Sequence, residues 1–172
     1  MRPSLDSYML AIAHVVATRS TCQRRAVGCV IVDLYGRILA TGYNGVAAGR
    51  PHCNESREEN NNEPTHRCSG ASSASGEQLD ACQAIHAEQN TLVWCRAPDQ
   101  IKTTYTTTPP CISCVKLLLS TSCQRVVTTG TYPQAALAKA LWEAAGRFWL
   151  DYPSKQAVRL DLTSRDDPRG AL

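Results

Sequence analysis

A chain of 172 residues with a net charge of +3 has the length of one domain and enough residues to fill a single core. Hydrophobic residues make up 43% of it and charged residues 19%, which excludes an intrinsically disordered protein. The charge is too small to argue for a nucleic-acid partner, and no stretch approaches the roughly 18 apolar residues of a membrane span. We therefore expect neither a membrane nor a nucleic acid as partner.

The chain contains nine cysteines, a high and odd number. The apolar run near the N-terminus is interrupted by Asp6, Tyr8 and His14, so it is better interpreted as an amphipathic helix than as the core of a secretory signal. We expect a cytoplasmic protein, in the host cytoplasm if it is viral. In that compartment many cysteines indicate metal binding before disulfides.

The predicted elements alternate between helix and strand. Apolar spacing predicts a helix over 5–19, followed by two strands over 27–32 and 37–42 that form a hairpin. The later expected elements are helices over 82–95, 111–119 and 133–145 and strands over 103–107, 125–129, 148–152 and 158–162. This alternation predicts an α/β fold in three layers, an α/β/α sandwich with helices on both faces of one sheet.

Residues 44–80 interrupt the alternation, because they are rich in Gly, Asn, Ser, Glu and Pro and show no sustained apolar period. So long an irregular stretch in a compact domain is usually functional, or needs a tether of its own. We expect one domain over 1–162 that includes this segment, and a frayed tail over 163–172.

Two short motifs predict the chemistry. His86-x-Glu88 is followed by Pro110-Cys111-x-x-Cys114, which together supply one imidazole, two thiolates and a carboxylate. A structural zinc takes four tightly held nitrogen or sulfur ligands, whereas a catalytic zinc keeps one position for water. We therefore predict a catalytic Zn2+ on His86, Cys111 and Cys114, with Glu88 as the catalytic group that moves protons.

The expected helices support this assignment. Cys111 and Cys114 would lie at the start of a helix, where its dipole and unpaired N–H groups stabilise thiolates. In a helix over 82–95, His86 and Glu88 would not share a face, so Glu88 would reach toward the water rather than bind the metal. The alternative is a structural zinc knuckle with a fourth cysteine, which leaves Glu88 and Pro110 unexplained.

The His-x-Glu and Pro-Cys-x-x-Cys pattern is the known signature of zinc nucleobase deaminases. Over 86–90 and 107–116 the chain resembles the cytidine/deoxycytidylate deaminase superfamily. Ser20-Thr21-Cys22, Val27-Gly28 and Gly42-Tyr43-Asn44-Gly45 narrow the resemblance to deoxycytidylate (dCMP) deaminases of bacteria and phages. It implies a mixed five-stranded sheet between helices, hydrolysis of dCMP to dUMP and ammonia for thymidylate synthesis, and a homohexamer.

The resemblance also implies a second, structural zinc. Its ligands carry over most clearly to Cys22, Cys53 and Cys82, with Cys68 as the fourth and His66 as the alternative fourth. Cys53 and Cys68 lie in polar surroundings, which argues against their being simple buried apolar residues. A closed four-ligand site would explain how the 44–80 segment is held.

Contacts with the nucleotide follow from the same resemblance. Relatives place the loop asparagine, here Asn44, at the nucleotide site and an aromatic residue, here Tyr132, against the pyrimidine ring. Ala87 and Thr108 are assigned to the substrate with them. The candidates for a 5′-phosphate contact are Ser20, Thr21, Arg24 and Arg25.

The loop Gly42-Tyr43-Asn44-Gly45 carries a regulatory expectation too. In the family this loop is associated with allosteric control, in which dCTP with Mg2+ activates and dTTP inhibits. The family pattern continues with a proline where this chain has Ala47, and Gly49 is kept. This departure bears on regulation more than on catalysis.

Three other functions remain open from the residues. Deamination of dCTP needs the same chemistry and differs in a few loop contacts. A tRNA or single-stranded DNA deaminase should show a basic stripe or an aromatic platform, which the charge and the scattered aromatic residues do not provide. A non-catalytic zinc module is the alternative of another class, and Glu88→Gln separates it from an enzyme.

Overall fold

The computed structural model describes residues 2–53, 70, 73, 77 and 81–153. The expected strand over 158–162, the domain boundary at 162, the tail over 163–172 and most of the 54–80 segment lie outside these residues, as do Cys68 and His66. None of the helices in the described part is long and apolar enough to cross a membrane.

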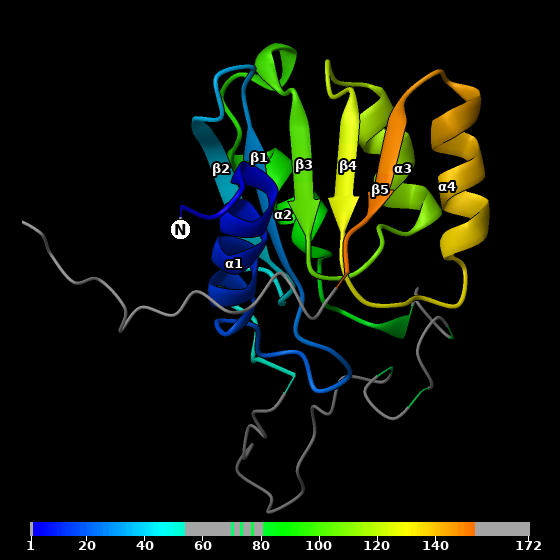
Figure 1. Ribbon diagram of the computed structural model, residues 1–172. Helices are drawn as coiled ribbons and strands as arrows, with labels where there is room; N and C mark the ends of the chain where they lie inside the picture. The colour runs from blue at the N-terminus through cyan, green and yellow to red at the C-terminus, as the bar shows by residue number, and fades with distance from the viewer. Residues whose placement is uncertain (1, 54–69, 71–72, 74–76, 78–80, 154–172) are drawn as a thin grey trace, which may run out of the picture.

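One five-stranded sheet forms the centre of the fold, in the order β2-β1-β3-β4-β5 (Figure 1). The strands are β1 (Gly28–Val32), β2 (Ile38–Tyr43), β3 (Thr103–Thr106), β4 (Arg125–Thr128) and β5 (Phe148–Asp151). β1 is antiparallel to both β2 and β3, whereas β3, β4 and β5 run parallel. Parallel neighbours need a crossover connection, and helices provide it between β3, β4 and β5.

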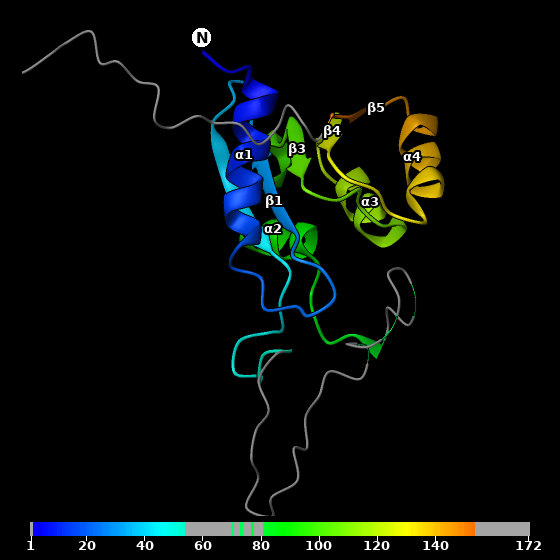
Figure 2. The same cartoon turned by 60° about the horizontal axis from the view of Figure 1, so that its bottom comes forward.

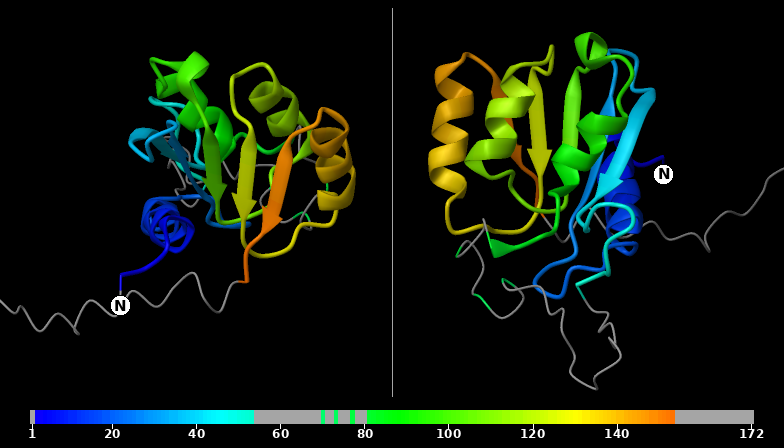
Figure 3. Two further views of the ribbon diagram at one scale, coloured as in Figure 1. Left: turned by 45° about the horizontal axis from the view of Figure 1, so that its top comes forward. Right: turned by 180° about the vertical axis from the view of Figure 1, so that it is seen from behind.

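Helices cover both faces of the sheet. They are α1 (Leu5–Ala17), α2 (Ala87–Trp94), α3 (Ile112–Leu119) and α4 (Ala135–Ala144), with a short 3-10 helix, η2, over Pro98–Gln100. α1 lies on one face, and α2, α3 and α4 lie on the other (Figures 1 and 3). The predicted three-layer α/β/α sandwich with a mixed five-stranded sheet is confirmed.

β1 shows why this chain makes three layers. All five of its residues are buried, and its side chains alternate between two apolar clusters. Val30 and Val32 pack with α1, whereas Cys29 and Ile31 pack with the three helices on the other face. A strand that is apolar on both sides requires a helix layer over each face.

One predicted helix begins later than expected. α2 begins at Ala87, so the expected helix over 82–95 is wrong over 82–86. The backbone of Ile85 instead pairs with Gly45, through N–H···O distances of 2.9 and 3.2 Å. His86 has extended dihedrals and is the N-cap of α2. The other helix and strand ends differ from expectation by two residues or fewer, as fraying ends do.

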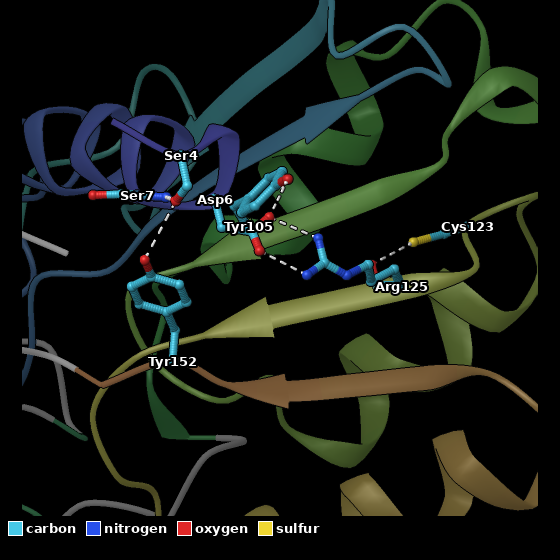
Figure 4. A network of polar contacts seen from close by, with 7 residues as sticks. All are labelled: Ser4, Asp6, Ser7, Tyr105, Cys123, Arg125 and Tyr152. Atoms are coloured by element: carbon cyan, nitrogen blue, oxygen red, sulfur yellow. Dashed lines mark hydrogen bonds and ion pairs between the residues drawn. The ribbon is translucent and has the colours of Figure 1, made fainter. Parts of the chain in front are cut away.

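An ion pair fastens α1 to the sheet (Figure 4). Asp6, in the first turn of α1, accepts two hydrogen bonds of 2.7 Å from Arg125 at the start of β4. It also accepts a hydrogen bond of 2.9 Å from the hydroxyl of Tyr105 on β3. The two charged side chains are only 20% and 28% exposed, so solvent screens the pair less than at an open surface.

We expect Asp6→Asn to lower the free energy of unfolding by about 2 kcal/mol at pH 7, because a two-pronged charged pair is lost. The hydrogen bond from Arg125 lowers the pKa of Asp6 below its usual 3.8. The difference in free energy of unfolding between parent and variant should therefore be fully present above about pH 5. It should vanish as the pH falls through the lowered pKa of Asp6. Urea unfolding at several pH values measures it.

Lys139→Met is the matched control for this prediction. Lys139 pairs with Asp151 at 2.8 Å, but the two side chains are 36% and 61% exposed. We expect a loss of no more than about 0.5 kcal/mol there, since exposed pairs contribute little. Equal losses in the two variants would contradict a special role for Asp6.

Candidate active site

Two helix N-termini carry the three predicted metal ligands. His86 is the N-cap of α2, Cys111 is the N-cap of α3, and Cys114 lies in the first turn of α3. Nδ1 of His86 lies 3.4 Å from Sγ of Cys111 and 3.4 Å from Sγ of Cys114. Among the described residues, this is the one group of three or more metal-capable side chains whose ligand atoms lie within 4.8 Å of one another.

The spacing of these atoms fits a tetrahedral zinc. Zn–S bonds of about 2.3 Å and Zn–N bonds of about 2.0 Å place nitrogen and sulfur about 3.5 Å apart at the tetrahedral angle. The two observed nitrogen–sulfur distances are 3.4 Å. Three protein ligands of this kind leave one coordination position open, as in catalytic zinc sites.

The two thiols differ in how readily they form the thiolate that binds a metal. A hydrogen bond from Cys114, supported by one from His86, lowers the pKa of Cys111 to about 4. The hydrogen bond with Cys111 and burial hold the pKa of Cys114 well above its usual range, and the hydrogen bond with Cys111 raises the pKa of His86. Zinc binds thiolates, so binding at this site is coupled to loss of the proton on Cys114.

Glu88 lies beside the three candidate ligands. Its carboxyl group offers oxygen atoms, so it does not supply the fourth nitrogen or sulfur ligand of a structural zinc site. Its side chain is only 4% exposed, and its Oε2 accepts a hydrogen bond from Sγ of Cys114 at 3.6 Å. Burial raises the pKa of Glu88. A carboxyl group with a raised pKa is suited to take up and return a proton near neutral pH.

These side chains open onto one pocket. The pocket is lined by His86, Glu88 and Cys111 and by all four residues assigned to the substrate, Asn44, Ala87, Thr108 and Tyr132. Arg24, Arg25 and Pro109 line the pocket too. Pro109 was not predicted to be part of the site. The pocket lies at the end of the sheet that comes forward in Figure 2, where β3 and β4 have their carboxyl ends.

The loop after β2 supports this pocket. Gly42 packs against α2, and the backbone carbonyl of Tyr43 accepts a hydrogen bond from Asn90 of α2. Gly45 pairs with Ile85, directly before His86. Asn44, expected to contact the nucleotide, uses its side chain to bind the loop before β1. Each residue of the motif therefore has a structural contact.

The expected second zinc site includes residues outside the described part of the chain. Cys53 is buried, whereas Cys22 and Cys82 line the pocket of the first site. These three cysteines do not form a group with ligand atoms within 4.8 Å of one another in the described part of the chain. The remaining candidates, Cys68 and His66, lie outside it.

Comparison with known proteins agrees with this site. The profile described as "Cytidine and deoxycytidylate deaminase zinc-binding region" matches residues 3–129. A Schizosaccharomyces pombe deoxycytidylate deaminase is 37% identical over 84% of this chain, which spans only 43% of that protein. A Mycobacterium phage D29 deoxycytidylate deaminase is 38% identical over 73% of this chain and 94% of its own length.

A solved structure shares the fold. The dCMP deaminase of cyanophage S-TIM5, crystallised with dCMP and dUMP, aligns with a TM-score of 0.64 and 22% identity, over 88% of this chain and 99% of its own. The family profile covers most of the residues described above, including His86, Glu88, Cys111 and Cys114. The chain belongs to the cytidine and deoxycytidylate deaminase zinc-binding family.

Proposed function

We propose that this chain hydrolyses dCMP to dUMP and ammonia, and so supplies dUMP for thymidylate synthesis. The observation that carries the proposal is the buried carboxyl of Glu88 beside the His86, Cys111 and Cys114 cluster, next to a pocket that His86, Glu88 and Cys111 line. The choice of dCMP as substrate is supported by two relatives, both named deoxycytidylate deaminase, that are 37% and 38% identical to this chain. The matched region covers 94% of the phage relative, so it accounts for most of that protein.

The residues of the site can carry the proton transfers. A zinc ion held by His86, Cys111 and Cys114 would supply a Lewis acid that lowers the pKa of a coordinated water toward roughly 7. Glu88 accepts a proton from the attacking water and passes it to the ring nitrogen next to the attacked carbon. It then transfers the second water proton to the departing amino group, which leaves as ammonia. Glu88 ends in its starting state.

The experiment that tests the proposal is ammonia release from zinc-loaded protein. dCMP, dCTP, deoxycytidine and cytidine are offered as substrates in parallel. Each substrate other than dCTP is also tested with dCTP plus Mg2+ added as effector. We expect dCMP to be deaminated fastest. Preference for dCTP would replace the substrate within the same chemistry, and no release from any of the four would contradict the proposal.

Regulation by nucleotides is part of the proposal. dCTP with Mg2+ is proposed to activate and dTTP to inhibit, through the loop Gly42-Tyr43-Asn44-Gly45. Support comes from the contacts of this loop, since Gly42 and Tyr43 touch α2 and Gly45 pairs with the residue before His86. An effector that moved the loop would therefore move a metal ligand and Glu88. The same assay with added dTTP measures this effect.

A second zinc, held by Cys22, Cys53 and Cys82 with Cys68 or His66, is also proposed. Its support is the resemblance and the number of cysteines. We expect about two zinc ions per chain in the parent, because structural and catalytic sites each bind one. Cys111→Ser with Cys114→Ser should keep about one, and Cys22→Ser with Cys53→Ser should also keep about one. Atomic absorption counts them, and one zinc in the parent would contradict the second site.

We propose a homo-oligomer, a hexamer by resemblance, in the cytoplasm. At the end of α2, Val93 and Trp94 are 75% and 76% exposed, and the charged residue of this helix, Glu88, is buried. Exposed apolar side chains on an uncharged helix surface are typical of a contact between proteins. Sedimentation of Trp94→Glu tests it: we expect a smaller species than the parent.

A further inference from the structure

Two neighbouring arginines line the pocket and have different partners. Nη2 of Arg24 donates a hydrogen bond of 2.9 Å to the backbone carbonyl of Glu77. Nη1 of Arg25 donates one of 2.7 Å to the backbone carbonyl of Thr131, in the turn after β4. Both arginines were candidates for the 5′-phosphate, but Arg25 spans the pocket edge to another loop. Its guanidinium already has a short, charge-assisted hydrogen bond there.

Asn44 fixes the backbone from which Arg25 extends. Its Nδ2 donates to the carbonyl of Arg25 at 2.8 Å, and its Oδ1 accepts from the N–H of Val27 at 2.8 Å and the hydroxyl of Ser20 at 2.7 Å. Asn44 is only 8% exposed. Three of the four hydrogen bonds that its amide can make are therefore used to shape the segment 20–27.

The other end of the contact leads directly to a pocket residue. Thr131 is followed by Tyr132, which lines the pocket with Cys111 and Glu88. The hydroxyl of Tyr132 is the one buried side-chain oxygen or nitrogen without a hydrogen-bond partner among the described residues. A buried hydroxyl without a partner costs free energy, so it is expected to gain one when the pocket is filled.

We propose that Arg25 is a positioning residue. Its hydrogen bond to the Thr131 carbonyl, called the latch below, holds the Tyr132 hydroxyl in the pocket. There the substrate supplies the hydrogen-bond partner of this hydroxyl. The latch itself rests on contacts within the chain. Only its effect on turnover rests on the proposed function. Arg25 on this view does not contact the substrate and is not a phosphate ligand.

Hydrogen–deuterium exchange tests the latch without any substrate. In Arg25→Met, amide hydrogens in a peptide covering 129–134 should exchange about tenfold faster than in the parent, because local opening becomes easier. Arg24→Met is the matched control and should leave this peptide within about twofold of the parent. Unchanged exchange in Arg25→Met would overturn the latch, whether or not the protein deaminates dCMP.

A double-mutant cycle tests the effect on turnover. Arg25→Met should lower kcat/KM about tenfold for both dCMP and deoxycytidine, and should have no further effect in a Tyr132→Ala background. Arg25→Lys, which keeps a positively charged N–H donor, should recover most of the activity. If Arg25→Met impairs dCMP alone, and multiplies with Tyr132→Ala, Arg25 binds the phosphate and the inference is wrong.

Discussion

Glu88→Gln should reduce deamination by about 1,000-fold while the protein keeps its zinc, since a positioned acid–base group contributes about 10²–10⁴-fold. Gln has the size of Glu and can still hydrogen bond, but it cannot take a proton from water and return it. The three side chains that could hold the metal are His86, Cys111 and Cys114, and none is changed. Ammonia release gives the rate, and atomic absorption gives the metal content.

Glu88→Asp is the matched control, because it keeps an acid but withdraws it by one methylene. We expect its rate to lie between those of the parent and Glu88→Gln. Deamination by Glu88→Gln at the parent rate would exclude Glu88 as the proton carrier. Loss of zinc together with activity would instead give this buried side chain a structural role beside Cys114.

The sequence was sufficient to predict the architecture and the side chains of the His86, Cys111 and Cys114 cluster for physical reasons. β1 is apolar on both sides, which requires two helix layers. The short spacings His86-x-Glu88 and Cys111-x-x-Cys114 are local, and each falls at a helix start, where the backbone itself places the side chains. The local spacings do not show that the two motifs lie side by side in the fold. The resemblance to a known family supplied that prediction.

Contacts between distant segments could not be predicted in this way. The start of α2 was placed too early because the pairing of Ile85 with Gly45, forty residues apart, leaves no mark in the local pattern. Asn44 lines the pocket, but the hydrogen bonds of its amide with Ser20, Arg25 and Val27 were not predicted. Such hydrogen bonds depend on the tertiary fold, which a residue's immediate neighbours do not specify.

The role of Gly42 also depends on a contact between distant segments. The loop motif made Gly42 a candidate for binding a regulatory nucleotide. In the structure, a Cβ added to Gly42 would lie 2.5 Å from the Thr91 hydroxyl, 2.6 Å from the Thr91 nitrogen and 2.8 Å from the Ala87 carbonyl oxygen. Two of these atoms belong to the α2 backbone, so Gly42 allows β2 to approach the helix that begins directly after His86.

We therefore expect Gly42→Ala to lower the free energy of unfolding by about 3 kcal/mol, as overpacking against a fixed backbone does. α2 must move away from β2, which displaces His86 and Glu88 from the thiols of α3. Zinc affinity should fall with stability. Urea unfolding and zinc titration against a competing chelator measure the two effects.

Gly45→Ala is the control from the same loop. The nearest atoms to an added Cβ there lie 3.7 Å away, an ordinary contact, and the backbone pairing with Ile85 is kept. We expect a change of no more than about 0.5 kcal/mol, the size typical of a substitution without strain. If Gly42→Ala were equally stable and lost only its response to dCTP or dTTP, the glycine would serve the effector. Joint loss of stability and zinc affinity would show that the absence of a side chain at Gly42 lets β2 approach α2.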